Sequence, residues 1–347
     1  MNKRTLILLA LFIVLALLVY VQETGREKKA QQTPPELGLL FPDFDPQAIH
    51  GIRFGSFGSE VELIREGDNW FVLDAGQKFP ADQEAVDKAL DTTRELEAIQ
   101  LVSRDPTKHF EFQVNSPQET EITGENGEKK PMTMGTMGTE VIMTDGEQKE
   151  RAHFYVGKNG SVDFMTTYIR KEGNDHVLLS DGYLKMIYGK GGAASWKDLA
   201  ICEIAPEDIE TVTIGHGKEL IVLQQVQDET VQSETPATIW KMIQPDRGVV
   251  EGPMVQRITG MFRRFRASDF AATLDDPAAY GFESPSARIA IKPIEGDARV
   301  FLFGAAVGDK AEQFYFKEEG QDTVFVLPKY RLETIQKEPD AFFEESK

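Results

Sequence analysis

The sequence predicts an α+β protein in which two tandem homologous domains, each an antiparallel sheet with one main helix, follow an N-terminal transmembrane helix. Three observations predict this fold class: an uncharged stretch near the start, a set of residues that occurs twice, and alternating runs interrupted by one helical run in each copy. The expected boundaries are residues 1–22 for a cytoplasmic tail and membrane anchor, 23–45 for a linker, 46–200 for the first repeat and 201–347 for the second.

The uncharged stretch covers residues 5–22 and contains an unbroken apolar run from Leu6 to Val21. A helix rises about 1.5 Å per residue, so this stretch is long enough to cross a hydrocarbon core of about 30 Å. Lys3 and Arg4 precede it, and no small-x-small cleavage site follows it. We therefore expect an uncleaved, single-pass anchor in the bacterial inner (cytoplasmic) membrane, with the body in the periplasm or otherwise outside the cytoplasm.

The formal charge of −19 is unevenly distributed. Residues 1–30 carry five basic and two acidic side chains, a net of +3, which leaves −22 on the rest of the chain. An acidic body repels phosphate groups, so nucleic acid is not an expected partner, and the membrane is expected to be contacted only through residues 5–22. The single cysteine, Cys202, excludes an intramolecular disulfide and a cysteine-based metal cluster, and we expect it to be a core residue.

The repeat is visible as matched residues separated by 147 to 170 positions. The offset changes inside polar stretches, Gln118–Gly138 in the first copy and Gln224–Pro236 in the second, where insertions are tolerated best. The period is too long for a solenoid, so it indicates two tandem domains. The clearest matches are Ile49, Ile52 and Phe54 with Ile209, Val212 and Ile214; Trp70 with Trp240; Ser116-Pro117 with Ser284-Pro285; Phe154 and Gly157 with Phe301 and Gly304; and Tyr168 with Tyr315.

Each copy has the same expected order of elements. Three short strands come first, the third containing the tryptophan, and an amphipathic helix follows. Three or four more strands follow, at 141–143, 153–156, 168–170 and 177–179 in the first copy, and a short terminal helix, near 182–187 and 329–335, completes each copy. In the first copy the expected helix begins at Pro80 and Asp82 and buries Val86, Ala89, Leu90, Thr93, Leu96 and Ile99; in the second it begins at Gly252-Pro253 and buries Val255, Ile258, Phe262 and Phe265.

Six short pieces occur in a fixed order along the body. They are Ile49-x-x-Ile52-x-Phe54, Gly67-Asp68-Asn69-Trp70, Phe79-Pro80-Ala81-Asp82, Phe154-Tyr155-Val156-Gly157, Tyr168 with Val177, and Ser195-Trp196-Lys197-Asp198. This ordered set resembles a bacterial domain-of-unknown-function family, number 4340, in two tandem copies. Members of that family are associated with auxiliary proteins of gliding-motility-type ABC transporters. The resemblance implies a membrane-anchored protein that assists a transporter or envelope assembly, with ABC transporter subunits as partners, and it carries over no catalytic residues.

Metal and phosphate sites are not expected from the remaining motifs. The five histidines lack ligand spacing for zinc. Met132, Met134 and Met137, with Met143 nearby, have side chains that bind Cu(I), but a Gly/Thr-rich inserted loop explains them more simply. The run Gly189–Gly192 lacks the phosphate-loop pattern and is interpreted as a linker.

Four arginines cluster on or beside the expected helix of the second copy, in an otherwise acidic body: Arg257, Arg263, Arg264 and Arg266. One hypothesis is that this patch docks an acidic partner or glycan, but pairing with neighbouring carboxylates explains the arginines more simply. With no nucleophile motif and no cofactor site in view, the predicted function is a non-enzymatic accessory protein of an ABC-type transport or envelope-assembly system. The alternative is a lipid- or glycan-binding module that uses a cleft between the two repeats.

Overall fold

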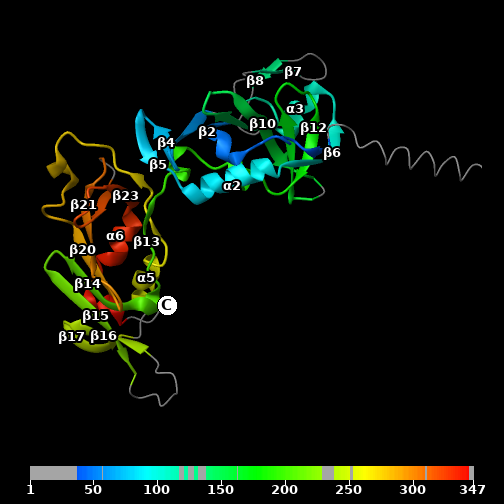
Figure 1. The fold of residues 1–347 in the computed structure, drawn as a ribbon. Helices are drawn as coiled ribbons and strands as arrows, with labels where there is room; N and C mark the ends of the chain where they lie inside the picture. Colours follow the sequence, from blue (N-terminus) through cyan, green and yellow to red (C-terminus); the bar gives the residue numbers. More distant parts are fainter. Residues whose placement is uncertain are drawn as a thin grey trace, which may run out of the picture. The chain divides into compact units, whose positions relative to one another are not determined.

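The computed structural model describes residues 37–343, except 57, 117–120, 124–128, 132–137, 162, 229–237, 251–252 and 309–310. The chain divides into two compact units, of which the first ends at Lys197 and the second begins at Asp198 (Figure 1). Each unit has its own cluster of buried apolar side chains, so each contains a separate hydrophobic core.

The first unit is built on a ten-stranded sheet in which every neighbouring pair is antiparallel. Its strand order is β1-β6-β12-β11-β10-β9-β2-β3-β4-β5. A separate hairpin, β7 (Glu121–Thr123) with β8 (Lys129–Pro131), lies in the inserted segment. The strands are β1 Gly38–Leu39, β2 Ile49–Ser56, β3 Ser59–Glu66, β4 Asn69–Asp74, β5 Gln77–Pro80, β6 Glu97–Ser103, β9 Thr139–Asp145, β10 Glu150–Asn159, β11 Thr166–Lys171 and β12 Val177–Asp181.

One face of this sheet is covered by α2 (Gln83–Arg94) (Figure 1). The helix begins because the Asp82 side chain accepts a hydrogen bond from the backbone of Ala85 at 3.1 Å, which satisfies one of its free N–H groups. Its residues Val86, Ala89, Leu90 and Thr93 are buried at helical spacing. The core is completed by residues near the end of the unit: α4 (Lys185–Tyr188), the 3-10 turn η3 (Ala193–Ser195), and Trp196, whose ring stacks on Phe54 at 4.3 Å between centroids.

The second unit contains a nine-stranded antiparallel sheet in the order β17-β16-β15-β14-β20-β21-β22-β23-β19, and a two-stranded sheet of β13 with β18. The helix α5 (Pro253–Met261) and the terminal helix α6 (Lys329–Ile335) pack into its core. The strands are β13 Ala200–Cys202, β14 Ile209–His216, β15 Glu219–Gln227, β16 Thr238–Gln244, β17 Asp246–Val250, β18 Phe265–Arg266, β19 Asp269–Phe270, β20 Ala287–Pro293, β21 Arg299–Ala306, β22 Gln313–Glu318 and β23 Phe325–Pro328.

The two sheets have the same strand order when they are read from β5 and from β17. The registers agree as well, since Ile52 pairs with Leu63 where Val212 pairs with Leu223. The strand β6 of the first unit corresponds to two short strands of the second, β18 and β19, because β18 pairs with β13 and β19 pairs with β23. A residue of one unit can therefore be compared with its counterpart in the other, strand by strand.

The predicted fold class is wrong in its helical part. The described residues are mostly antiparallel strand, and instead of one main helix per repeat the first unit has α2, α3 (His109–Phe112) and α4, and the second has α5 and α6. The helices α4 and α6 lie close to the short terminal helices expected near 182–187 and 329–335. The helix α3 was not expected, because a single turn is too short to produce a helical period in the sequence. The predicted transmembrane helix falls in residues 1–22, outside the described residues, and no helix within 37–343, gaps aside, is long and apolar enough to cross a bilayer.

Candidate functional site

The four arginines predicted as a partner-binding cluster are all exposed on the second unit. Arg257 lies on α5, whose opposite side buries Val255 and Ile258. Arg263 and Arg264 follow the end of α5, and Arg266 is in β18. Arg263 pairs with Glu207, Nη2 to Oε2 at 3.1 Å, and both side chains are more than half exposed. The predicted cluster therefore lies along one helix and the strand that follows it, where exposed ion pairs are weak and easily exchanged for a partner.

The same positions of the first unit carry different charges. The buried residues of α2 align with those of α5 and the turn after it at a constant offset of 169, as in Val86 with Val255 and Thr93 with Phe262. At this offset the four arginines correspond, in order, to Lys88, Arg94, Glu95 and Glu97. The last two positions are thus acidic in the first unit and basic in the second, at equivalent places in the fold.

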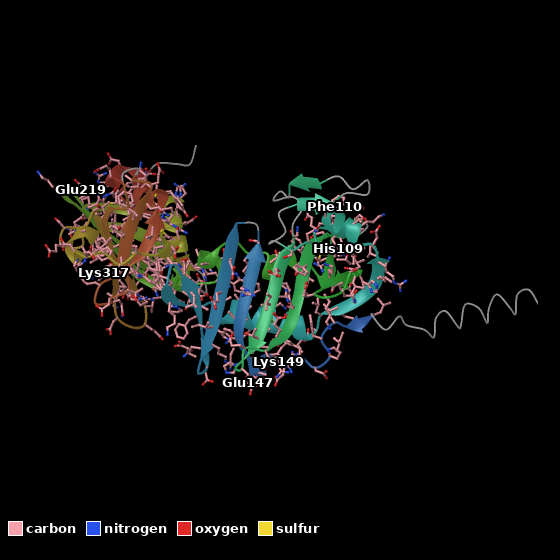
Figure 2. All side chains as sticks on the ribbon, turned by 90° about the horizontal axis from the view of Figure 1, so that it is seen from above. His109, Phe110, Glu147, Lys149, Glu219 and Lys317 are labelled. Carbon is pink, nitrogen blue, oxygen red and sulfur yellow. The ribbon has the colours of Figure 1, made fainter. Side chains whose placement is uncertain are left out.

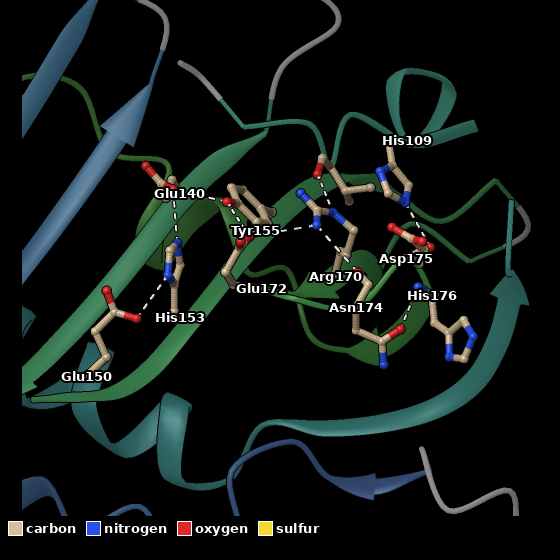
Figure 3. Close-up of polar contacts among 11 residues, drawn as sticks. His109, Glu140, Glu150, His153, Tyr155, Arg170, Glu172, Asn174, Asp175 and His176 are labelled. Atoms are coloured by element: carbon tan, nitrogen blue, oxygen red, sulfur yellow. Dashed lines mark hydrogen bonds and ion pairs between the residues drawn. The ribbon is translucent and has the colours of Figure 1, made fainter. Parts of the chain in front are cut away.

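A polar cluster lies on the first sheet, on the face opposite the side chains that pack with α2. Figure 3 shows its contacts. Along β10 the side chains of Ala152, Phe154 and Val156 enter the core, so those of His153 and Tyr155 lie on the other face. The neighbouring strands β9 and β11 add further polar groups on this face. The cluster consists of Glu140, Glu150, His153, Tyr155, Arg170 and Glu172.

These side chains bond to one another in a chain. His153 lies between two carboxylates, with Nε2 at 3.0 Å from Glu140 Oε1 and Nδ1 at 3.2 Å from Glu150 Oε2. The Tyr155 hydroxyl donates to Glu172 Oε2 at 2.6 Å and also lies 3.1 Å from Glu140 Oε1. The Arg170 guanidinium carbon is 4.1 Å from the centre of the Tyr155 ring. Its Nε donates to the backbone oxygen of Val114 at 3.0 Å, which ties the turn after α3 to β11.

The electrostatics of the cluster follow from these contacts. The hydrogen bond from His153 lowers the pKa of Glu140 against the effect of burial. Burial alone disfavours a charged His153, but the hydrogen bond to Glu140 and the negative charge of Glu150 outweigh it, so the His153 pKa is raised. Burial, followed by the bond to Glu172, raises the pKa of Tyr155 and keeps its hydroxyl protonated.

The cluster is suited to holding strands together and holding protons. Its donors and acceptors are used by one another across β9, β10 and β11, and Tyr155, the one hydroxyl among the six, is kept neutral. Sequence analysis did not identify this cluster. Glu140 and Tyr155 are among its buried members. The signal available in the sequence was the alternation along β10, where the polar residues His153 and Tyr155 alternate with the apolar residues Phe154 and Val156.

The corresponding face of the second unit has a groove of ≈ 550 Å³. Leu302 and Lys317, the latter labelled in Figure 2, stand where the first unit has Tyr155 and Arg170. The Lys317 Nζ lies 5.2 Å from the centre of the Phe282 ring, and Phe282 in turn stacks with Tyr280 at 6.0 Å. Leu302 is smaller than Tyr155, and Lys317 lacks the broad guanidinium group of Arg170. The second unit therefore has an open groove at a place where side chains fill the space in the first unit.

One family matches the sequence across both units. The family described as "Domain of unknown function (DUF4340)" matches residues 70–285 and 254–346. The chain belongs to this family. No curated protein and no solved structure matches it. The description of the family names no activity or partner, so the association with gliding-motility ABC transporters stays a prediction.

Two of the motifs on which the resemblance to this family was based have structural roles. In the motif Gly67–Trp70, both backbone groups of Trp70 are bonded to the Gln83 side chain. The Trp70 N–H donates to Gln83 Oε1 at 3.0 Å, and the Trp70 carbonyl accepts from Gln83 Nε2 at 3.1 Å. In Ser195–Asp198, Lys197 is buried with its Nζ 2.7 Å from Asp74 Oδ2. Both motifs therefore help to hold the core of the first unit together.

The residues that were considered and rejected above as metal or phosphate motifs are placed as follows. Met132, Met134 and Met137 lie outside the described residues, and Met143 is buried on β9. The part of the chain that the structure describes contains no group of three or more His, Cys, Asp or Glu side chains placed to hold a metal ion. Gly189 ends α4, and the Lys190 ammonium lies 4.5 Å from the Trp196 ring centre.

Cys202, on β13, is buried, and burial raises the pKa of its thiol to about 11.

Proposed function

We propose that this DUF4340 protein is a non-enzymatic accessory protein of an ABC-type transport or envelope-assembly system. In this proposal its body works outside the cytoplasm, is held at the inner membrane through the apolar residues 5–22, and contacts subunits of that system. The observation that supports a docking role is the row of four exposed arginines on an acidic chain. Such a local reversal of charge favours encounter with one acidic surface over others.

The test is co-purification from membranes in mild detergent. The double variant Arg263→Glu/Arg264→Glu should lose the ATPase and permease subunits that the wild type retains, because like charges then face the acidic partner. The matched control is Arg247→Glu/Arg288→Glu, which makes the same change of charge at two exposed arginines of the same unit, each paired with a local carboxylate. Retention of the subunits by the first variant, or equal loss in both, would refute the proposal.

The membrane part of the proposal has its own test. Deleting residues 5–22 should move the protein from the membrane fraction to the soluble fraction, because the remaining chain is acidic and repelled by anionic headgroups. A protein that stays in the membrane fraction after this deletion, and after a wash in 1 M salt, would show that another segment holds it there.

A second candidate function is the binding of a glycan, and the groove of the second unit supports it. Leu302 and Val324 give the groove an apolar floor, the Tyr280–Phe282 pair offers aromatic faces, and Lys317 and Glu319 supply polar groups for hydroxyls. Calorimetric titration with soluble peptidoglycan-derived glycan chains should give binding that Phe282→Ala abolishes. Absence of heat with the wild type removes this candidate.

A further inference from the structure

Four large apolar side chains are exposed at one end of the β11–β12 pair in the first unit. Phe164 is 74% exposed and Met165 66%, both in the turn before β11. Tyr183 is 40% exposed and Met186 68%, both just beyond β12. Single exposed apolar residues are ordinary, but such a group on one small area marks an interaction site.

The hydrogen-bonding pattern brings the two pairs of residues together. Thr166, which follows Met165, is paired with Asp181 across the strands. The Thr167 hydroxyl donates to the carbonyl of Gly182 at 2.7 Å and accepts from the backbone N–H of Leu184 at 3.2 Å. The turn that carries Phe164 and Met165 therefore adjoins the segment that carries Tyr183 and Met186.

A hollow of ≈ 300 Å³ opens beside this corner. Leu184 and Ile187, which lie within two residues of Met186 in the chain, form part of its wall, and Leu96 adds a third apolar side chain. Its charged lining is Glu95, Glu97 and Asp181 against a single lysine, Lys88, and Glu95 is also paired with Arg94, Oε1 to Nη2 at 3.2 Å. The neighbouring Lys185 is directed elsewhere, since its Nζ donates to Gln113 Oε1 at 3.0 Å. The corner thus combines exposed apolar side chains with an acidic hollow.

The second unit lacks this combination at the equivalent place. By the register of β22 and β23, Ala311 and Glu312 stand where the first unit has Phe164 and Met165. Arg264 and Arg266 stand where it has Glu95 and Glu97. The corner is therefore not a requirement of the fold, because a sheet of the same strand order forms without it.

We propose that Phe164, Met165, Tyr183, Met186 and the adjoining hollow form a docking surface for a segment of another protein that presents apolar side chains beside a lysine or arginine. Phenylalanine, tyrosine and methionine are enriched in protein interfaces. Tyrosine is also among the residues that most often carry the binding energy. The three carboxylates of the hollow complement a basic side chain of the partner and repel anionic lipid headgroups. This surface stands independently of the arginine cluster and of the assignment to a transport system.

The experiment is photo-crosslinking of the full chain in living cells, with a benzophenone amino acid in place of Met165 and, as the matched control, in place of the exposed Glu312 of the second unit. The crosslinked peptides are identified by mass spectrometry. The expected result is an adduct from position 165 to a peptide of another protein that has apolar residues next to a lysine or arginine. Position 312 should give no such adduct.

Charge reversal then tests the hollow. Glu95→Arg/Glu97→Arg, which installs the residues of the second unit, should lower the yield of the adduct by at least about tenfold, because like charges across an interface cost several kcal/mol. Glu111→Arg/Glu147→Arg makes the same change at two exposed acids elsewhere in the first unit and should leave the yield unchanged. An adduct to lipid, to a second copy of this chain or to a peptide without a basic residue would overturn the proposal. Equal yields from positions 165 and 312, or no effect of the first double variant, would do so as well.

Discussion

Replacement of Gly157 by alanine tests whether the repeated Phe-x-x-Gly motif is a packing requirement. Gly157 lies on β10, directly beneath the turn that ends α3. A Cβ placed on it would collide with the backbone oxygen of Phe112 and would lie 2.8 Å from Val114 Cγ1 and 3.1 Å from the backbone oxygen of Tyr168. The turn cannot retreat easily, because Gln113 holds the left-handed conformation with φ of 59° and Arg170 is bonded to Val114.

The expected loss of stability can be worked from these contacts. Overpacking of a close-packed site costs about 1–3 kcal/mol, and two of the three obstacles here are backbone atoms, so the upper end applies. Alanine is favoured over glycine in a strand interior by about 0.5–1 kcal/mol, which offsets part of the cost. Gly157→Ala should therefore destabilise the first unit by about 2 kcal/mol. Gly304→Ala should do the same in the second unit, where the backbone oxygen of Tyr280 takes the place of that of Phe112.

The assay is hydrogen–deuterium exchange of the full chain in low urea, read by mass spectrometry on peptides of β10–β11 and of β21–β22 separately. Gly157→Ala should raise exchange in the first set alone. The control is Gly215→Ala on β14, where an added Cβ meets nothing within 4 Å and a small gain is expected. If Gly157→Ala changes the opening free energy by less than about 0.5 kcal/mol, within the range of ordinary surface substitutions, or if Gly215→Ala costs as much, the packing argument fails.

Three other predictions concern buried polar groups. Asp74→Asn should lower the free energy of unfolding by about 1.5 kcal/mol, measured by urea unfolding with tryptophan fluorescence, because Asp74 accepts a bond from Lys197, whose side chain is 2% exposed; an unchanged midpoint would contradict this. Because the His153 pKa is raised in the folded state, its stabilising contribution is present below the unfolded value of about 6.5 and is lost as the pH rises through the raised folded value. His153→Gln should abolish that part of the pH dependence of urea unfolding, and an identical pH profile in the variant would refute the assignment. The raised pKa of Cys202 predicts that the native thiol reacts about a hundredfold more slowly with a thiol reagent at pH 8 than the urea-unfolded thiol does, and equal rates would show that it is accessible.

The sequence predicted elements where a period was long enough to be read. The alternating runs at 141–143, 153–156, 168–170 and 177–179 lie within β9, β10, β11 and β12. The apolar stripe predicted from Val86 to Ile99 lies on α2 and faces the core only as far as Thr93. The helix ends at Arg94, and Ile99 is exposed on β6. The single-turn helix α3 could not be found in this way, because four residues do not complete a detectable helical period. The short terminal helices were expected from their place at the end of each copy, and α4 and α6 lie close to the expected positions.

The polar cluster was out of reach of local sequence patterns for a different reason. His153 and Glu140 are thirteen residues apart and meet only because β9 and β10 pair in a particular register. Arg170 reaches Val114 across fifty-six residues of chain. Register is set by the whole sheet, so contacts of this kind follow from tertiary structure and not from spacing along the chain. The arginines of the second unit, in contrast, were visible because four of them occur within ten residues, from Arg257 to Arg266.

The opposite charges at equivalent positions, Glu95 and Glu97 against Arg264 and Arg266, have a practical consequence for isolating this protein. Electrostatic attraction at either surface is screened beyond about 10 Å in 0.1 M salt and beyond about 3 Å in 1 M salt. A high-salt wash would therefore weaken the electrostatic part of the binding proposed for both surfaces. The proposed partners are best sought in cell extracts prepared at low ionic strength.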